Sequence, residues 1–235
     1  MASIGTGLLL FAGALGALAF WSWRRRAQRL RYLRETPLPP GLYDKLRKKR
    51  PDIAPEHYPF VNRALRDFFA AYLLSGCKPV SMPSQAADEL WHEFILYTRN
   101  YDRFCRQAFG KFLHHTPAVV LSRNYDRNVG LRRVWWHACK LEGIDPRNPA
   151  RLPLLFALDT KLELTDGFRY ALDCHGLRDN NGSGGGGCGS QCATDMRDSS
   201  FDGTTDGFGD SGGGDSGGGD GGDGGGGDGG GCGGD

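Results

Sequence analysis

The residues best suited to chemistry lie in two short runs that are rich in histidine and carboxylate, DELWH at residues 88–92 and FLHH at residues 112–115. If the first run is helical, Asp88 and Glu89 share a face with His92, because residues three and four apart are neighbours on a helix. A carboxylate that accepts a hydrogen bond from an imidazole fixes its tautomer and makes its other nitrogen a better metal ligand. The first run therefore supplies a carboxylate and a histidine that could both bind one metal ion.

The second run supplies the remaining ligands if its segment folds back over the helix. Asp88 or Glu89, together with His92 and either His114 or His115, would then suit a transition metal such as Zn or Fe and leave one position open. A structural alternative uses the same residues: His92 would hydrogen bond to Asp88, and the loop histidines would cap backbone groups. The sequence leaves both alternatives open.

Motifs of common enzyme classes are absent from the sequence. It contains no HExxH zinc motif, no GxSxG nucleophile elbow and no GxxxxGK[ST] phosphate loop. The sequence thus predicts no catalytic residue and no cofactor beyond the metal alternative, and it does not decide whether the protein is an enzyme.

Helices are the elements that must position these residues. Apolar side chains recur at three- and four-residue steps, and no stretch alternates as a strand would. Helices are predicted over residues 58–75, over 84–110 with a kink near Asn100, over 128–142 and over 152–162, followed by a short element at 167–174. We expect an all-α domain of about five helices, over residues 41–178.

The N-terminal segment predicts a membrane anchor. Residues 4–23 carry no charged side chain, and Arg24, Arg25 and Arg26 follow at once. At about 1.5 Å per residue, this length matches a bilayer core of roughly 30 Å. The arginines favour a cytosolic flank and hence a cytosolic C-terminal domain. The alternative is a cleaved signal peptide, with residues 17–19 as the small-residue site.

Charge is distributed unevenly, although the formal net charge is only +2. A basic linker is predicted over residues 24–40, and the whole run from Arg24 to Arg50 is suited to anionic lipid. No nucleic-acid-binding module is recognisable, so nucleic acid is not an expected partner. Small residues such as Gly13 and Ala17 in the anchor would permit a homodimer.

The C-terminal tail, residues 179–235, consists mainly of Gly, Asp and Ser. Such a composition cannot bury enough apolar surface to offset its ordering entropy, and the tail is predicted to be disordered. Its cysteines at 188, 192 and 232, together with Cys174-His175 just upstream, could bind a soft metal. The alternative is a flexible tail in which these cysteines have no role.

Three segments carry a resemblance to known families. Residues 82–84, 88–96 and 112–117 resemble a group of uncharacterised bacterial membrane-anchored proteins with glycine-rich C-termini. More remotely, residues 88–92 with Tyr101 and Phe109-Gly110 resemble the Trp-His segment of plant glycine-rich domain-containing proteins. The plant pattern carries a second histidine where this chain has Glu93-Phe94. The resemblance supports the domain boundary and implies no activity. The anchor itself predicts a single-pass protein of a bacterial inner membrane.

Two functions are consistent with these features. The first is a membrane-anchored helical interaction or scaffold protein, whose tail reaches an unidentified protein partner. The alternative is a membrane-tethered metal-binding protein or metal-dependent enzyme that uses the histidine and carboxylate cluster.

Overall fold

A computed structural model describes residues 2–115, 125–172, 191–192 and 196, with side chains for residues 11–115, 129–172 and 196. Helices account for nearly all regular structure in this part, which confirms the predicted all-α class. The helices are α1 (Ala2–Glu35), α2 (Leu42–Lys49), η1 (Pro55–His57, a 3-10 turn), α3 (Tyr58–Leu74), α4 (Gln85–Ile95), α5 (Thr98–Phe109), α6 (Tyr125–Leu141) and α7 (Leu154–Lys161).

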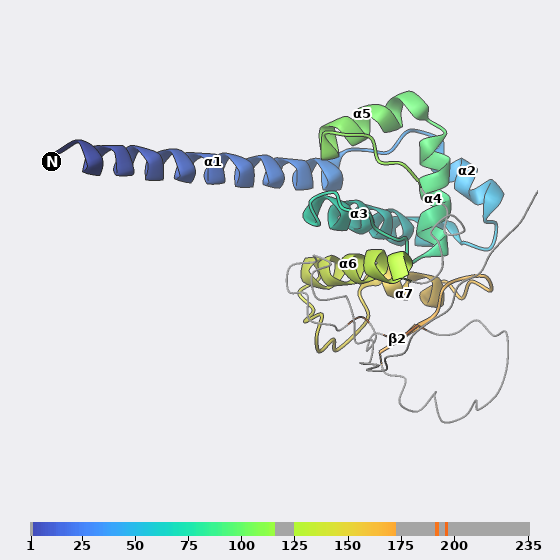
Figure 1. Cartoon of the computed structure of the whole chain (residues 1–235). Coiled ribbons are helices and arrows are strands. Elements are labelled where there is room, and N and C mark those ends of the chain that lie inside the picture. Colours follow the sequence, from blue (N-terminus) through green and yellow to red (C-terminus); the bar gives the residue numbers. More distant parts are fainter. Residues whose placement is uncertain (1, 116–124, 173–190, 193–195, 197–235) are drawn as a thin grey trace, which may run out of the picture.

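Helix α3 forms the centre of the domain. It contacts α1, α4, α6 and α7, and every residue from Phe68 to Leu73 is buried. Figure 1 shows α1 and α5 on one side of α3, α6 and α7 on the other, and α4 standing across their ends. The apolar periodicity of residues 58–75 thus predicts this helix correctly, but α3 buries more of its circumference than a one-sided amphipathic helix.

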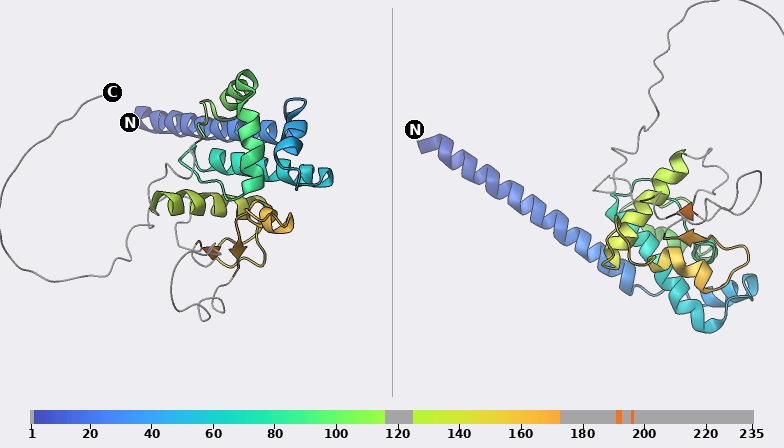
Figure 2. Two further views of the ribbon diagram at one scale, coloured as in Figure 1. Left: turned by 90° about the vertical axis from the view of Figure 1, so that its right-hand side faces the viewer. Right: turned by 90° about the horizontal axis from the view of Figure 1, so that it is seen from below.

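Helix α1 has two parts with different surroundings. Its C-terminal turns pack against α3 and α5, where Leu33 is fully buried, while the N-terminal part projects alone from the domain (Figures 1 and 2). The helix continues to Glu35, through most of the segment predicted as a linker over residues 24–40, and it ends before Pro37. The arginine-rich turns are therefore helical and partly belong to the domain core.

The predicted anchor is only partly covered by the described side chains. Residues 4–10 lie within α1, but their side chains lie outside the described part of the chain. Among the described residues, no helix combines the length and the apolar character needed to cross a bilayer. The membrane anchor stays a prediction.

The predicted long helix over residues 84–110 is two helices. The break lies at Leu96 and Tyr97 rather than near Asn100, and the Tyr97 backbone leaves the helical region with φ −82° and ψ 58°. The Tyr97 hydroxyl donates to the carbonyl of Pro40 at 3.2 Å. This turn lets α5 cross over α4, so that the segment after Gly110 returns toward α4 (Figure 1).

The C-terminal region differs from the prediction in two ways. The short element predicted over residues 167–174 contains a strand, β1 (Tyr170–Ala171), which pairs in parallel with β2 (Gln191–Cys192). Met196 is buried in the core. Gln191, Cys192 and Met196 belong to the predicted tail, whose other residues lie outside the described part of the chain. The folded domain thus includes residues beyond 178.

Candidate metal centre

Helix α4 carries Asp88 and His92, and its start is fixed by a double cap. The hydroxyl of Ser84 accepts from the N–H of Ala87 at 3.2 Å, as expected for an N-cap residue. The buried carboxylate of Asp159, from α7, accepts from the N–H groups of Gln85 at 2.7 Å and Ala86 at 3.2 Å. A negative charge at this end of a helix also interacts favourably with the helix dipole. Asp159 therefore fixes both the position and the register of α4.

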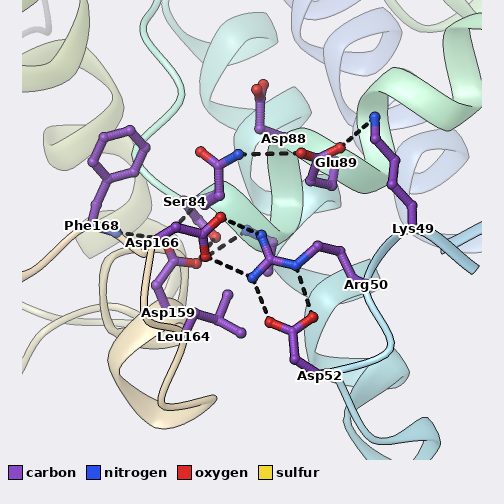
Figure 3. A network of polar contacts seen from close by, with 12 residues as sticks. Lys49, Arg50, Asp52, Ser84, Asp88, Glu89, Asp159, Leu164, Asp166 and Phe168 are labelled. Atoms are coloured by element: carbon purple, nitrogen blue, oxygen red, sulfur yellow. Dashed lines mark hydrogen bonds and ion pairs between the residues drawn. The ribbon is translucent and has the colours of Figure 1, made fainter. Parts of the chain in front are cut away.

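A second network holds the turn beside this cap (Figure 3). Arg50, at the end of α2, pairs bidentately with Asp52 and Asp166, with four N–O distances between 2.7 and 3.0 Å. The hydrogen bonds to these two carboxylates, first that to Asp52, raise the pKa of Arg50 above its ordinary value. The N–H of Phe168 donates to Asp159 at 2.9 Å. The segment around Phe168, which reaches the candidate site, is thereby tied to α2 and α7.

Three of the predicted ligands come together. An Asp88 carboxylate oxygen lies 2.9 Å from Nε2 of His115, and the other lies 3.6 Å from Nδ1 of His92. The centroids of the two imidazole rings are 4.2 Å apart. One ligand atom from each residue lies within 4.8 Å of the other two, and all three side chains are partly buried. The second run of the sequence therefore does fold back over the helix.

The geometry of these three residues fits a transition metal after small side-chain adjustments. With metal–ligand bonds of about 2.0–2.1 Å, a tetrahedral ion holds its ligands roughly 3.3 Å apart. Two imidazoles and one carboxylate form a ligand set used by zinc and by non-haem iron, and three protein ligands leave a coordination position open. The present hydrogen bond between Asp88 and His115 would be replaced by two bonds to the ion.

A buried tyrosine positions His115. The hydroxyl of Tyr101, which is fully buried, accepts from Nε1 of Trp91 at 3.0 Å and donates to the carbonyl of Leu113 at 2.6 Å. Burial raises the pKa of Tyr101 far above its ordinary value, so this hydroxyl keeps its proton. The Trp91 ring in turn packs edge-on against the ring of His115, with centroids 4.5 Å apart. Tyr101 thus connects α4, α5 and the segment that carries His115.

Glu89 lies at the edge of the group rather than within it. Its carboxylate is 3.9 Å from Nδ1 of His92, and its closer partner is Nζ of Lys49, at 2.7 Å. Lys49 also lies 3.9 Å from Glu93, and the hydrogen bond to Glu89 is the main cause that raises its pKa. With Asp88, three carboxylates surround this single lysine, so the neighbourhood has a surplus of negative charge that suits a divalent cation.

His114 is separate from the three converging residues. It is exposed, and its ring packs against Phe112, with centroids 4.7 Å apart. The sequence left His114 and His115 as alternatives. In the structure it is His115 that meets Asp88, while the Leu113 carbonyl before them is held by Tyr101. His114 remains a candidate only as a residue near the site.

A cavity of about 670 Å³ adjoins the group. Asp88 and His115 line it, together with apolar side chains and one lysine. The residues that define it further are Tyr72, Cys77, Met82, Gln85, Lys111 and Phe112. Its volume falls within the range of about 300–1,000 Å³ typical of small-molecule sites.

Sequence reasoning did not identify three residues that shape this site: Asp159, Tyr101 and Lys111. Tyr101 was named only within the remote resemblance, and Asp159 fell only within the helix predicted over residues 152–162. Periodicity reports which face is buried, but it does not report which distant backbone group a polar atom meets. A polar residue at a position where the pattern predicts burial, as at Asp159, is the one signal that was present in the sequence.

Comparison with known proteins places the chain in a family. The model of the UCP032817-like family matches residues 28–196. The chain belongs to this family. The matched range begins in the part of α1 that packs on the domain and ends at the buried Met196, so it coincides with the folded unit described above. The chain matches no curated protein and no solved structure.

Proposed function

We propose that this protein is a membrane-tethered metal-binding protein that holds a divalent transition metal with Asp88, His92 and His115. The observation that carries the proposal is the convergence of these three side chains, whose ligand atoms lie within 4.8 Å of one another beside a cavity. Two of these residues lie on α4 and His115 lies after α5. The hydrogen bonds of Tyr101 join the two segments and so fix the geometry of the group.

Electrostatics favours a cation over an empty hydrogen-bonded cluster. Two imidazole rings 4.2 Å apart can both donate a lone pair to one ion. The carboxylates of Asp88, Glu89 and Glu93 all lie near one ammonium group, that of Lys49. An ion bound by three protein ligands keeps a position for water or substrate, which is also the arrangement of catalytic zinc sites.

The tether in this proposal is the N-terminal part of α1, spanning a bacterial inner membrane with the domain on the cytoplasmic side. Large apolar side chains surround this part of the helix and are 51–66% exposed; these are Phe11, Leu15, Leu18, Phe20, Trp21 and Trp23. Residues 4–23 are uncharged in the sequence, and the run from Arg24 to Arg50 supplies cations for anionic headgroups. Fusions of a reporter to Asp235 test the orientation: activity confined to the periplasmic reporter would contradict it.

Metal binding is tested with the full chain purified in detergent, with the tail cysteines replaced by serine so that they do not contribute. We expect about one Zn per chain and a rise in stability of about 2.7 kcal/mol at a zinc concentration of 100 times Kd. Removal of a ligand, as in Asp88→Asn or His115→Gln, should weaken zinc binding at least about tenfold.

The matched controls make the same kinds of substitution, Asp to Asn and His to Gln, at positions outside the group. Asp102→Asn alters an exposed carboxylate that pairs with Arg106 at 2.9 Å, and His57→Gln alters a histidine outside the group. Both should bind zinc as the wild type does. Equal zinc affinity in Asp88→Asn and Asp102→Asn would contradict the proposal. The scaffold role expected from the sequence stays a prediction, since no described feature identifies a protein partner.

A further inference from the structure

The point at which α1 leaves the domain lies beside one end of the cavity. Arg26 donates to the carbonyl of Leu74, at the C-terminus of α3. The guanidinium of Arg29 lies against Gly110, at the C-terminus of α5, only 2.7 Å from the position that a Cβ would occupy there. Gly110 also has φ +81°, so a side chain at this position would be both strained and blocked.

These contacts place that end of the domain at the depth of lipid headgroups if α1 is the anchor. Arg26 follows Trp23 by about 4.5 Å along the helix, and Arg29 follows it by about 9 Å. The headgroup layer of one leaflet is roughly 5–8 Å thick. The C-termini of α3 and α5 therefore lie within or just below the headgroup layer.

The cavity wall begins at these same C-termini. Nζ of Lys111, the residue after Gly110, donates to the carbonyl of Cys77 at 3.2 Å, and both residues line the cavity. The lining of the same cavity also includes Asp88 and His115. One cavity is thus lined both by residues next to the predicted membrane surface, Cys77 and Lys111, and by two residues of the candidate metal centre.

The lining combines apolar surface with positive charge at the membrane end. Tyr72, Met82 and Phe112 contribute apolar side chains. Burial raises the pKa of the Cys77 thiol, and nearby positive charges act in the opposite direction. Those charges belong to Lys111, Arg29 and Arg26. An ammonium group has three donors, and Lys111 uses one of them on Cys77, so it can still bind an anion.

From this arrangement we infer that the cavity admits an anionic phospholipid from the cytoplasmic leaflet, with its phosphate at Lys111 and its headgroup directed toward Asp88 and His115. The inference rests on the membrane anchor of the proposed function. It names the substrate class of the candidate metal centre: an amphiphile with a phosphate headgroup. Apolar lining alone would suit many ligands, but the cations at the headgroup level select an anion.

The experiment uses the full chain in phosphatidylcholine nanodiscs that contain a small fraction of phosphatidylglycerol with a diazirine near the glycerol end of one acyl chain. After illumination, mass spectrometry maps the cross-linked residues. We expect cross-links on two regions, the apolar part of α1 and the cavity residues Tyr72, Met82 or Phe112. The α1 cross-links serve as an internal standard for the amount of lipid around the anchor.

Two variants test the cavity. Lys111→Gln removes the phosphate partner and should lower the ratio of cavity to α1 cross-links about fivefold, the effect of one lysine at an anionic surface. Met82→Trp fills the cavity and should lower the same ratio. The matched control, Lys161→Gln, removes an exposed lysine on α7 and should leave the ratio unchanged.

Each failure has its own signature. Cross-links on α1 without cross-links in the cavity, or an equal ratio in Lys111→Gln and Lys161→Gln, would overturn the lipid inference while the anchor stands. Absence of α1 cross-links would instead contradict the anchor itself. Cavity cross-links that persist in excess soluble glycerol 3-phosphate support the bilayer as the source, and their loss would assign the site to a free phosphate compound. Zinc affinity, measured on the same samples, reports separately on the metal centre.

Discussion

The substitution Tyr101→Phe is the sharpest test of how the fold positions the candidate metal centre. It removes one oxygen and keeps the ring, so packing in the core is retained. The Tyr101 hydroxyl makes two hydrogen bonds, at 3.0 Å with Trp91 and at 2.6 Å with the Leu113 carbonyl. Both partners are buried, with 4% and 6% exposure, so water does not replace the lost oxygen.

The expected cost follows from these contacts. Each hydrogen bond contributes about 1 kcal/mol net, and each buried group left without a partner costs about 1–3 kcal/mol. Since the two contributions overlap, we expect Tyr101→Phe to lower the free energy of unfolding by about 2–4 kcal/mol. Release of Leu113 also loosens the segment that carries His115, and we expect zinc affinity to fall several-fold, toward the roughly tenfold loss seen when supporting residues of metal ligands are removed.

The assay is urea unfolding of the full chain in detergent, followed by tryptophan fluorescence, together with zinc titration. Tyr97→Phe is the matched control: its hydroxyl makes a single hydrogen bond, with Pro40 at 3.2 Å, in a partly exposed site, so the loss should stay below about 1 kcal/mol. Trp135→Phe breaks a buried hydrogen bond to Pro146, away from the group, and should lower stability without changing zinc affinity. Equal effects of Tyr101→Phe and Tyr97→Phe would refute the positioning role.

Two further substitutions follow from buried carboxylates. Their control is Asp44→Asn, which changes an exposed side chain of α2 and should alter neither stability nor its pH dependence. Asp159→Asn turns an amide N–H toward the backbone donors of α4 and should cost about 2–4 kcal/mol in the same urea assay, so a loss within error of the control would contradict the cap. Burial raises the pKa of Asp67 from 3.8 to about 6, and one of its oxygens is buried without a hydrogen bond. Because the folded state then holds a proton that the unfolded state has released, stability should fall by up to about 3 kcal/mol as pH rises from 4 to 6. Asp67→Asn should remove this pH dependence and be more stable than wild type at pH 7; an unchanged slope would show that another group is responsible.

The site shows where sequence reasoning succeeds and where it stops. The spacing of Asp88 and His92 predicts that both side chains share a helical face, and they do, at 3.6 Å. The choice between His114 and His115 was open, because both lie in an irregular segment without periodicity. It is decided by Tyr101, whose hydroxyl holds the Leu113 carbonyl and so sets which histidine turns inward.

The break between α4 and α5 also depends on a contact between residues far apart in the sequence. The apolar pattern continues across residues 84–110, and it therefore predicts one helix with a kink near Asn100. The backbone turns at Tyr97 instead, where the tyrosine hydroxyl meets Pro40 of a segment far away in the sequence. Such a contact leaves no trace in local periodicity.

The sequence by itself determined the features that depend on neighbouring residues: the helical class, the shared face of Asp88 and His92, and the uncharged run at residues 4–23. These follow from the helical repeat and composition, which act within a few residues. Only the tertiary structure decided that Asp159 caps α4, that Arg29 packs on Gly110, and that His115 meets Asp88. Each of these joins groups 27 or more residues apart, because their meeting depends on the path of the whole chain around α3.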